Sequence, residues 1–311
     1  MDVRERVAII GSGLIGRAWA IVFAGGGCEV ALYDSVAGVA DTACALVAEG
    51  LDELAAQGLV ADPKVAAARV RSATSLSDAL DGATFVQENT AERLEVKRAI
   101  FAELDRLAAP DTILASSTST IVASSFTENL KGRQRCLVAH PVNPPHLVPL
   151  VELVAAPWTA PAVVAKAKAV YEAVGQVPIV VKREIEGFIL NRLQAVLLSE
   201  AFRLVEDGYV TPQDLDKTLK DGLGLRWSFM GPFETIELNA PGGIPDYCAR
   251  YGASLSRLSA ADPAIYSGEK LAYVMAQWPN ALTADQVAAR MRWRDRRLAA
   301  LYSHKRSQSA D

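Results

Sequence analysis

The first 182 residues alternate short apolar runs with longer segments in which apolar and polar residues follow a helical period. The runs are rich in β-branched residues and are bounded by turn-forming residues, which is the pattern of strands buried in a sheet. They lie at residues 6–10, 28–34, 84–88, 112–117, 136–140, 150–155 and 177–182. Helical patterns stand between them, for example over 93–108 and 160–174. Strands that alternate with helices predict βαβ units, and hence an α/β fold with a doubly wound, mostly parallel sheet.

After residue 182 no apolar run of comparable quality follows, and the pattern becomes helical. The segment FILNRLQAVLLSEAFRLVEDG (188–208) carries apolar residues on all sides, which predicts a buried helix. Thr211 precedes a proline and acidic residues, which is typical of the start of another helix. The chain of 311 residues is long enough for two domains. We predict an α/β domain over 1–185 and an all-α domain over 186–311.

Composition excludes several classes of protein. The net charge of −4 and the isoelectric point near 5.6 argue against nucleic acid or an anionic membrane as a partner. No apolar run is long enough to cross a bilayer, and the first predicted strand begins too early for a signal peptide. The four cysteines have no metal-binding spacing and the three histidines are too few for a histidine-rich metal site. We therefore expect a cytoplasmic protein without a metal.

A glycine-rich turn, GSGLIG (11–16), follows the first predicted strand and opens the first helix. In this context Gly11 permits the tight turn, Gly13 lets the backbone approach a diphosphate, and Gly16 lets the helix pack close to the strand. Asp34 ends the second strand, 18 residues after Gly16, where a carboxylate binds the ribose hydroxyls of the adenosine. We predict a Rossmann-type site for NAD rather than NADP, because a carboxylate would repel a 2′-phosphate. The motif assigns Gly11, Gly13, Leu14, Ile15, Gly16 and Asp34 to the cofactor. The alternative is an ordinary strand–turn–helix without a nucleotide.

Two titratable residues stand in otherwise apolar strands. His140 ends one strand, and a proline-rich turn over 141–149 leads into the strand that holds Glu152. If the two strands pair, the carboxylate would fix the imidazole and leave its other nitrogen to act as a base. The alternative is a core histidine beside an edge-strand acid. His146 is a competitor, for which a role at the loop surface is the better interpretation.

Other polar residues are candidates for the same crevice. The hydroxyls of ASSTST (115–120) follow another strand end, although Ser and Thr there also form turns. Asn191 lies within an apolar helix, where a buried amide must bond a neighbouring helix or point into a cleft.

The motifs GSGLIG, AERLEVK, SSTST, HPVNPPHLVPLVELV and EGFILNRL resemble, in this order, the 3-hydroxyacyl-CoA dehydrogenase superfamily. The second half, with SEAFRLVEDGYVTPQDLD and DGLGLRWSFMGPFETIELNAPGG, is similar to the lambda-crystallin and L-gulonate 3-dehydrogenase branch. The resemblance implies His140 as general base and Glu152 as its orienting partner, with Ser119 and Asn191 as hydrogen-bonders to the reacting oxygen. It also implies that Glu92, Lys97, Ser117 and Asn143 approach the nicotinamide half of NAD. A homodimer through the helical domain, and oxidation of L-gulonate to 3-dehydro-L-gulonate, are implied as well.

The choice between a free acid and a CoA thioester depends on charge. In the superfamily the segment after the second strand helps to bind the anionic CoA, yet residues 35–68 hold five acidic residues and one lysine. We therefore favour a small 3-hydroxy acid, with Arg226 as the candidate anchor for its carboxylate. A surface or dimer-contact role for Arg226 is the alternative. Two rival functions remain: a short-chain 3-hydroxyacyl-CoA dehydrogenase, and a non-catalytic NAD-binding or structural protein of the crystallin kind.

Overall fold

The computed structural model describes residues 5–228, 230–258 and 284–307. Its internal contacts divide the chain into two compact units, one of residues 1–189 with 284–311, the other of residues 190–283. The first unit thus ends four residues after the predicted boundary and also takes in the last helix. Part of the predicted second domain, residues 259–283 and 308–311, lies outside the described residues.

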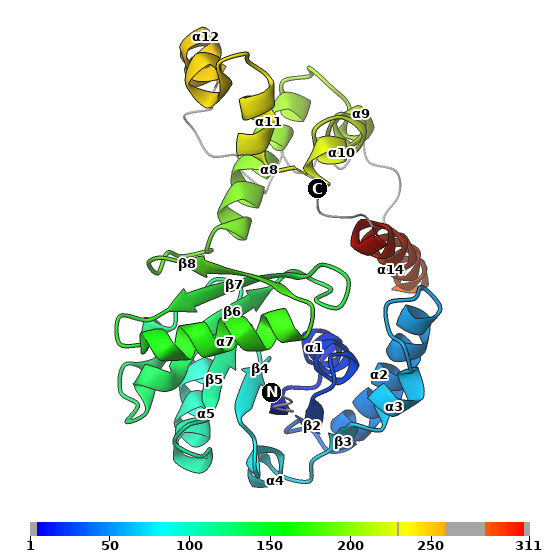
Figure 1. Cartoon of the computed structure of the whole chain (residues 1–311), viewed down its shortest axis with the longest axis vertical. Helices are drawn as coiled ribbons and strands as arrows, with labels where there is room; N and C mark the ends of the chain where they lie inside the picture. Colours follow the sequence, from blue (N-terminus) through cyan, green and yellow to red (C-terminus); the bar gives the residue numbers. More distant parts are fainter. Residues whose placement is uncertain (1–4, 229, 259–283, 308–311) are drawn as a thin grey trace. The chain divides into compact units, whose positions relative to one another are not determined.

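An eight-stranded sheet forms the centre of the first unit, with helices on both faces (Figure 1). The strands are β1 Arg6–Ile10, β2 Glu29–Tyr33, β3 Val70–Ser72, β4 Phe85–Glu88, β5 Ile113–Ser116, β6 Cys136–Pro141, β7 Leu150–Ala155 and β8 Val177–Val181. Their order is β3-β2-β1-β4-β5-β6-β7-β8. All neighbours are parallel except β6 and β7, which are antiparallel. The predicted doubly wound, mostly parallel sheet is confirmed.

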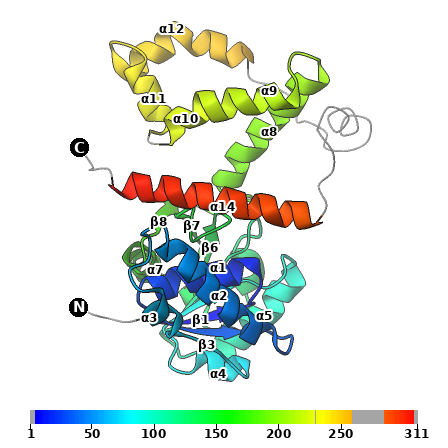
Figure 2. The same ribbon diagram turned by 90° about the vertical axis from the view of Figure 1, so that its right-hand side faces the viewer.

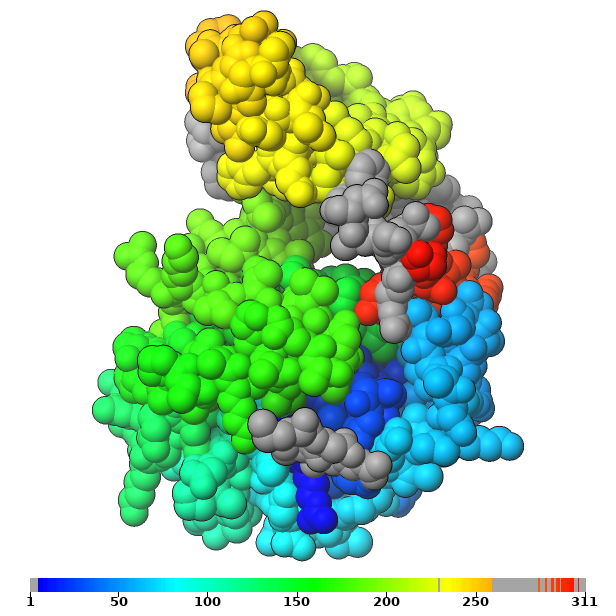
Figure 3. Space-filling view, viewed as in Figure 1, coloured from blue at the N-terminus to red at the C-terminus, as the bar shows by residue number. Residues whose placement is uncertain are grey.

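The helices of the first unit cover two hydrophobic layers. They are α1 Leu14–Gly25, α2 Val39–Ala55, α3 Pro63–Ala67, α4 Leu76–Leu80, α5 Leu94–Leu107, α6 Ser124–Thr127, the 3₁₀ turn η1 Arg133–Arg135, α7 Pro161–Ala173 and α14 Ala284–Ser307. Alternate residues of β1 pack into the two layers, because successive side chains of a strand point to opposite faces of the sheet. Val7 packs with α1, α2 and α7, whereas Ala8 packs with α4, α5 and α6. In Figure 3 the residues of α2 and α3 form the blue to light-blue surface along one side of this unit.

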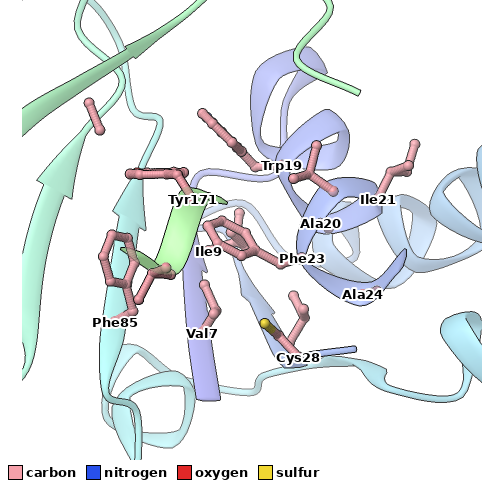
Figure 4. Packing of buried hydrophobic residues seen from close by; sticks show 14 of the residues in the cluster. Val7, Ile9, Trp19, Ala20, Ile21, Phe23, Ala24, Cys28, Phe85 and Tyr171 are labelled. Carbon is pink, nitrogen blue, oxygen red and sulfur yellow. The ribbon is translucent and has the colours of Figure 1, made fainter. Parts of the chain in front are cut away.

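Four aromatic rings fill the layer beneath the glycine turn (Figure 4). Trp19 and Phe23 of α1 stack at 5.5 Å, and Tyr171 of α7 lies 5.3 Å from Trp19 and 5.6 Å, edge-on, from Phe85. These offset and edge-to-face arrangements are the favourable ones for aromatic rings. The cluster fixes α1, and with it the glycine turn, against the sheet.

The last helix packs on the first unit (Figure 2). Ala299 of α14 is buried in the layer that contains α1, and the Tyr302 hydroxyl donates to the Gly175 carbonyl at 3.0 Å. The basic segment 290–306 lies within this helix.

All the regular secondary structure described in the second unit is helical. Its elements are α8 Leu190–Glu206, α9 Pro212–Lys217, the π-helical η2 Thr218–Leu223, α10 Gly224–Trp227, α11 Pro232–Leu238 and α12 Gly243–Leu258. The Thr211 hydroxyl accepts the Asp214 N–H at 3.2 Å and caps α9, as predicted. The prediction of a buried α8 is wrong for the single chain: only Val205 of this helix is buried, and Leu193 and Val196 are 66% and 72% exposed. Within the residues that the structure describes, no helix is long and apolar enough to cross a membrane.

Candidate active site

The three glycines of the turn between β1 and α1 meet different surroundings. Gly11 has φ of 92°, and a β-carbon there would lie 2.8 Å from the backbone of Asn89. A β-carbon on Gly16 would lie 1.9 Å from the carbonyl oxygen of Gly11. A β-carbon on Gly13 would meet nothing within 4 Å. Gly11 and Gly16 are thus required by the protein itself, whereas the space at Gly13 is open to a ligand.

Asp34 is tied to the same turn. Its Oδ2 accepts the Ser12 N–H at 2.8 Å and its Oδ1 accepts the Val36 N–H at 3.0 Å. Each carboxylate oxygen has a second lone pair, so both can still accept a ribose hydroxyl. The sequence predicted Asp34 as the ligand of the ribose hydroxyls, and the structure places it beside the glycine turn.

A cavity of about 510 Å³ opens beside the glycine turn, at the first turns of α1 and α2. Its lining includes Ser12, Gly13, Arg17, Gly38 and Thr42. The Ser12 hydroxyl is buried and has no hydrogen-bond partner among the described residues. An unbonded hydroxyl, an arginine and a helix N-terminus fit the diphosphate of a dinucleotide. Leu14 is 46% exposed, and Ile15 packs against the hydrophobic layer of α1.

The titratable pair is formed by the antiparallel pairing of β6 with β7. His140 lies directly opposite Glu152 in the register, and its Nδ1 is 2.8 Å from Glu152 Oε2. The imidazole is 5% exposed and the carboxylate is fully buried. A carboxylate accepts, so Nδ1 carries the proton and Nε2 is left as the basic nitrogen. Sequence reasoning predicted this pair, and the structure brings it together.

The segment before α8 closes around the pair. The backbone N–H of Ile189 donates to the other carboxylate oxygen, Glu152 Oε1, at 2.8 Å. The Phe188 ring is fully buried, and its centroid lies 5.4 Å from that of His140. The sequence did not predict either contact. The motif EGFI marks this segment in the sequence, but it does not show which residues the segment contacts.

The serine-rich segment after β5 is held by Glu92. Its Oε1 accepts the Thr118 hydroxyl at 2.6 Å and the backbone N–H groups of Ser119 and Thr120 at 2.9 and 3.0 Å. Partial burial alone would raise the pKa of Glu92. The hydrogen bonds from this turn and the charge of Lys97 outweigh burial, so the pKa is lowered. The Ser119 side chain is exposed on the turn that Glu92 fixes.

Lys97 belongs to a buried ion pair that sequence reasoning did not find. Its ammonium lies 2.8 and 3.0 Å from the two oxygens of Glu88 and 3.0 Å from the Thr90 carbonyl oxygen. Lys97 is 1% exposed and Glu88 is fully buried. The Ser116 hydroxyl also donates to Glu88, at 2.6 Å. As placed here, Lys97 ties the start of α5 to the ends of β4 and β5.

Ser117 is part of a buried polar network. Its hydroxyl accepts Trp19 Nε1–H at 3.0 Å and Gln87 Nε2–H at 2.7 Å, and donates to Asn89 Oδ1 at 2.7 Å. The Tyr171 hydroxyl donates in turn to Gln87. A hydroxyl can donate one hydrogen bond and accept two, so the hydrogen-bonding capacity of Ser117 is filled by these residues of the protein.

The remaining predicted residues are placed as follows. Asn143 is exposed and His146 is half-buried, both in the turn between β6 and β7. Asn191 is half-buried in the first turn of α8, and Arg226 is exposed on α10; both belong to the second unit. Among the residues that the structure describes, no cluster of His, Cys, Asp and Glu could hold a metal ion. Burial raises the pKa of Cys136 to about 12 and of Cys28 to about 11, as for inert core thiols.

Models of one protein family match both parts of the chain. Residues 6–185 match the NAD-binding domain of 3-hydroxyacyl-CoA dehydrogenase, and residues 187–268 match its C-terminal domain. The chain is 41% identical to lambda-crystallin of Oryctolagus cuniculus, over 96% of each chain. It is 39% identical to L-carnitine dehydrogenase of Pseudomonas aeruginosa, over 80% of this chain and 77% of that one.

The fold has close relatives among crystal structures. An NAD⁺-dependent dismutase, 5-formyl-3-hydroxy-2-methylpyridine 4-carboxylic acid 5-dehydrogenase, is 29% identical with a TM-score of 0.85, over 98% of this chain and 99% of that one. The NAD cofactor predicted from the glycine turn is thereby supported. The chain therefore belongs to the 3-hydroxyacyl-CoA dehydrogenase family and is an NAD-dependent dehydrogenase.

Proposed function

We propose that the protein oxidises a small 3-hydroxy acid to the 3-oxo acid with NAD, and that L-gulonate, which gives 3-dehydro-L-gulonate, is the leading substrate. The observation that carries the proposal is the buried contact of 2.8 Å between His140 and Glu152 on the adjacent strands β6 and β7. A base oriented in this way is what an alcohol needs when it loses a proton as its carbon is oxidised.

The residues of this chain have separate tasks. Glu152 holds Nδ1 of His140, so Nε2 takes the proton of the C3 hydroxyl, and the buried carboxylate stabilises the imidazolium that results. Ser119 and Asn191 donate or accept hydrogen bonds at the reacting oxygen. The glycine turn holds the diphosphate and Asp34 holds the ribose hydroxyls. Glu92, Lys97, Ser117 and Asn143 belong to the nicotinamide half, where Lys97 and Ser117 act through their bonds to neighbouring residues of the protein. NAD, when bound, supplies the hydride acceptor.

A free acid is favoured over a CoA thioester because residues 35–68, which include α2, are acidic as a whole. Asp41, Glu49, Asp52 and Glu53 lie on α2, and Lys64 is the one basic residue of residues 35–68. The exposed Arg226 is the proposed anchor of the substrate carboxylate. Replacing it with leucine should raise the KM for a hydroxy acid much more than for an uncharged alcohol, and equal effects would refute the anchor.

The exposed apolar residues of α8 support a homodimer through the helical part of the chain. Leu193, Val196, Leu197 and Leu198 are 38–72% exposed on this helix, a density that is unusual for a surface that stays in water. We propose that a second copy covers them, and that the protein acts in the cytoplasm.

The deciding experiment measures NADH formation with L-gulonate, 3-hydroxybutyrate, L-carnitine and 3-hydroxybutyryl-CoA. We expect the free acids to be oxidised, with L-gulonate best. Preference for the thioester would favour the rival acyl-CoA dehydrogenase, and inactivity on all four would favour a structural protein of the crystallin kind. His140→Ala should abolish turnover and leave NADH binding nearly intact; retained turnover would refute the mechanism.

A further inference from the structure

The backbone just before α8 adopts an unusual conformation. Gly187 has φ of 73° and Phe188 has φ of 50°. Among the described residues, Phe188 is the one non-glycine residue with a positive φ. For a bulky side chain this region is a true outlier, and it persists only where the surroundings impose it. Such outliers concentrate at functional sites, so the contacts made by this segment are of interest.

The conformation serves both members of the catalytic pair at once. It directs the Phe188 ring to the imidazole of His140, at 5.4 Å between centroids and 49° between planes. The next residue, Ile189, donates its N–H to the oxygen of Glu152 that His140 does not use. Phe188 is fully buried, in the hydrophobic layer that also contains Val138 and Val154. The base is therefore held by a carboxylate on one side and by a buried ring on another.

We propose that Phe188 is a positioning residue for the base. The ring limits rotation of the imidazole, and the left-handed turn at 187–188 sets the N–H that holds Glu152. Displacing a catalytic group by about 1 Å can cost on the order of 100-fold in rate without touching the substrate. This inference rests on the proposed function, in which His140 is the base.

The chain offers a matched control for the loss of the ring. Phe126 of α6 is 3% exposed, belongs to the same hydrophobic layer, and contacts Phe101 at 4.7 Å between centroids. Phe126→Leu makes the same chemical change as Phe188→Leu in the same layer. A third variant, Gly187→Ala, keeps the ring but opposes the left-handed backbone.

The test compares kcat, KM, NADH affinity and melting temperature of these three variants. Phe188→Leu and Gly187→Ala should lower kcat about 10- to 100-fold, with KM and NADH affinity within about threefold of wild type. Phe126→Leu should leave kcat within about twofold, whatever its melting temperature. Added to Glu152→Gln, Phe188→Leu should cause little further loss, because both act through His140.

Equal kcat in the two leucine variants, or fully additive losses with Glu152→Gln, would overturn the proposal. If Phe188→Leu does not fold, Gly187→Ala decides, and a wild-type kcat in that variant overturns it. Turnover in His140→Ala would refute the base and this inference together. Loss in His140→Ala with wild-type kcat in Phe188→Leu would refute this inference alone.

Discussion

Glu152→Gln tests the proposed catalytic pair most directly, because glutamine has nearly the same shape but one acceptor oxygen in place of two. In the wild type the two oxygens face two donors, His140 Nδ1–H and Ile189 N–H, each at 2.8 Å. A glutamine can satisfy only one of them. If its oxygen stays at Ile189, its amide donates to Nδ1, and the proton moves to Nε2, which can then no longer act as a base. If its oxygen turns to His140, the amide meets the Ile189 N–H.

Either arrangement has a cost of known size. Loss of the base lowers the rate by about 10²–10⁴-fold, and a buried donor without an acceptor costs about 1–3 kcal/mol of folding stability. In either case kcat for NADH formation should fall: by that factor in the first arrangement, and in the second through loss of the carboxylate charge that stabilises the imidazolium, with a lower urea midpoint as well. Glu172→Gln is the control, since Glu172 is exposed and pairs only with Lys168 among the contacts described. A kcat for Glu152→Gln within threefold of wild type would refute the reasoning.

Three further predictions follow from buried or crowded groups. Lys97→Met leaves the buried Glu88 without its cation, so the free energy of unfolding by urea should fall by about 3–5 kcal/mol. Adding Glu88→Gln should restore part of that stability. An unchanged free energy of unfolding in the single variant would contradict the ion pair. Hydrogen bonds lower the pKa of Glu92 in the folded protein below its usual value of 4.5. The carboxylate therefore stabilises the fold above pH 4.5, and this stabilisation is lost as the pH falls through the lowered pKa of the folded state. The melting temperatures of wild type and Glu92→Ala should differ at neutral pH and converge in acid. Gly13→Ala should keep the wild-type melting temperature but weaken NADH binding. Gly16→Ala should lower the melting temperature itself, because only a β-carbon on Gly16 collides with the backbone. Identical behaviour of the two variants would be inconsistent with this glycine turn.

The sequence predicts most of the sheet, the glycine turn and the pairing of His140 with Glu152. These features depend on local patterns: buried parallel strands are continuous apolar runs, and a turn between two strands favours their pairing. The strand β3 was not predicted, because three residues with one arginine give no periodic signal. The exposure of α8 was not predicted either, since a helix that is apolar all round has the same pattern whether its own chain or another covers it.

The supporting contacts of the site escaped prediction for a different reason. Glu88 and Lys97 are nine residues apart across a turn, and Phe188 meets His140 across 48 residues. Such contacts depend on how whole elements pack. A charged residue at the end of a strand looks the same in sequence whether it is buried in an ion pair or exposed. The roles of the positioning residues therefore emerge only from the three-dimensional arrangement.

The antiparallel register of β6 and β7 decides which parts of this hairpin can change without moving the proposed base and its partner. His140 and Glu152 are opposed within the paired strands, whereas residues 142–149 form the turn outside the pair. A one-residue slip in either strand would carry its catalytic side chain to the opposite face of the sheet. The turn is free of this constraint. Turns of different length and composition could therefore join these strands with His140 and Glu152 still opposed, and Asn143, which is proposed to approach the nicotinamide, is the position of the turn to keep.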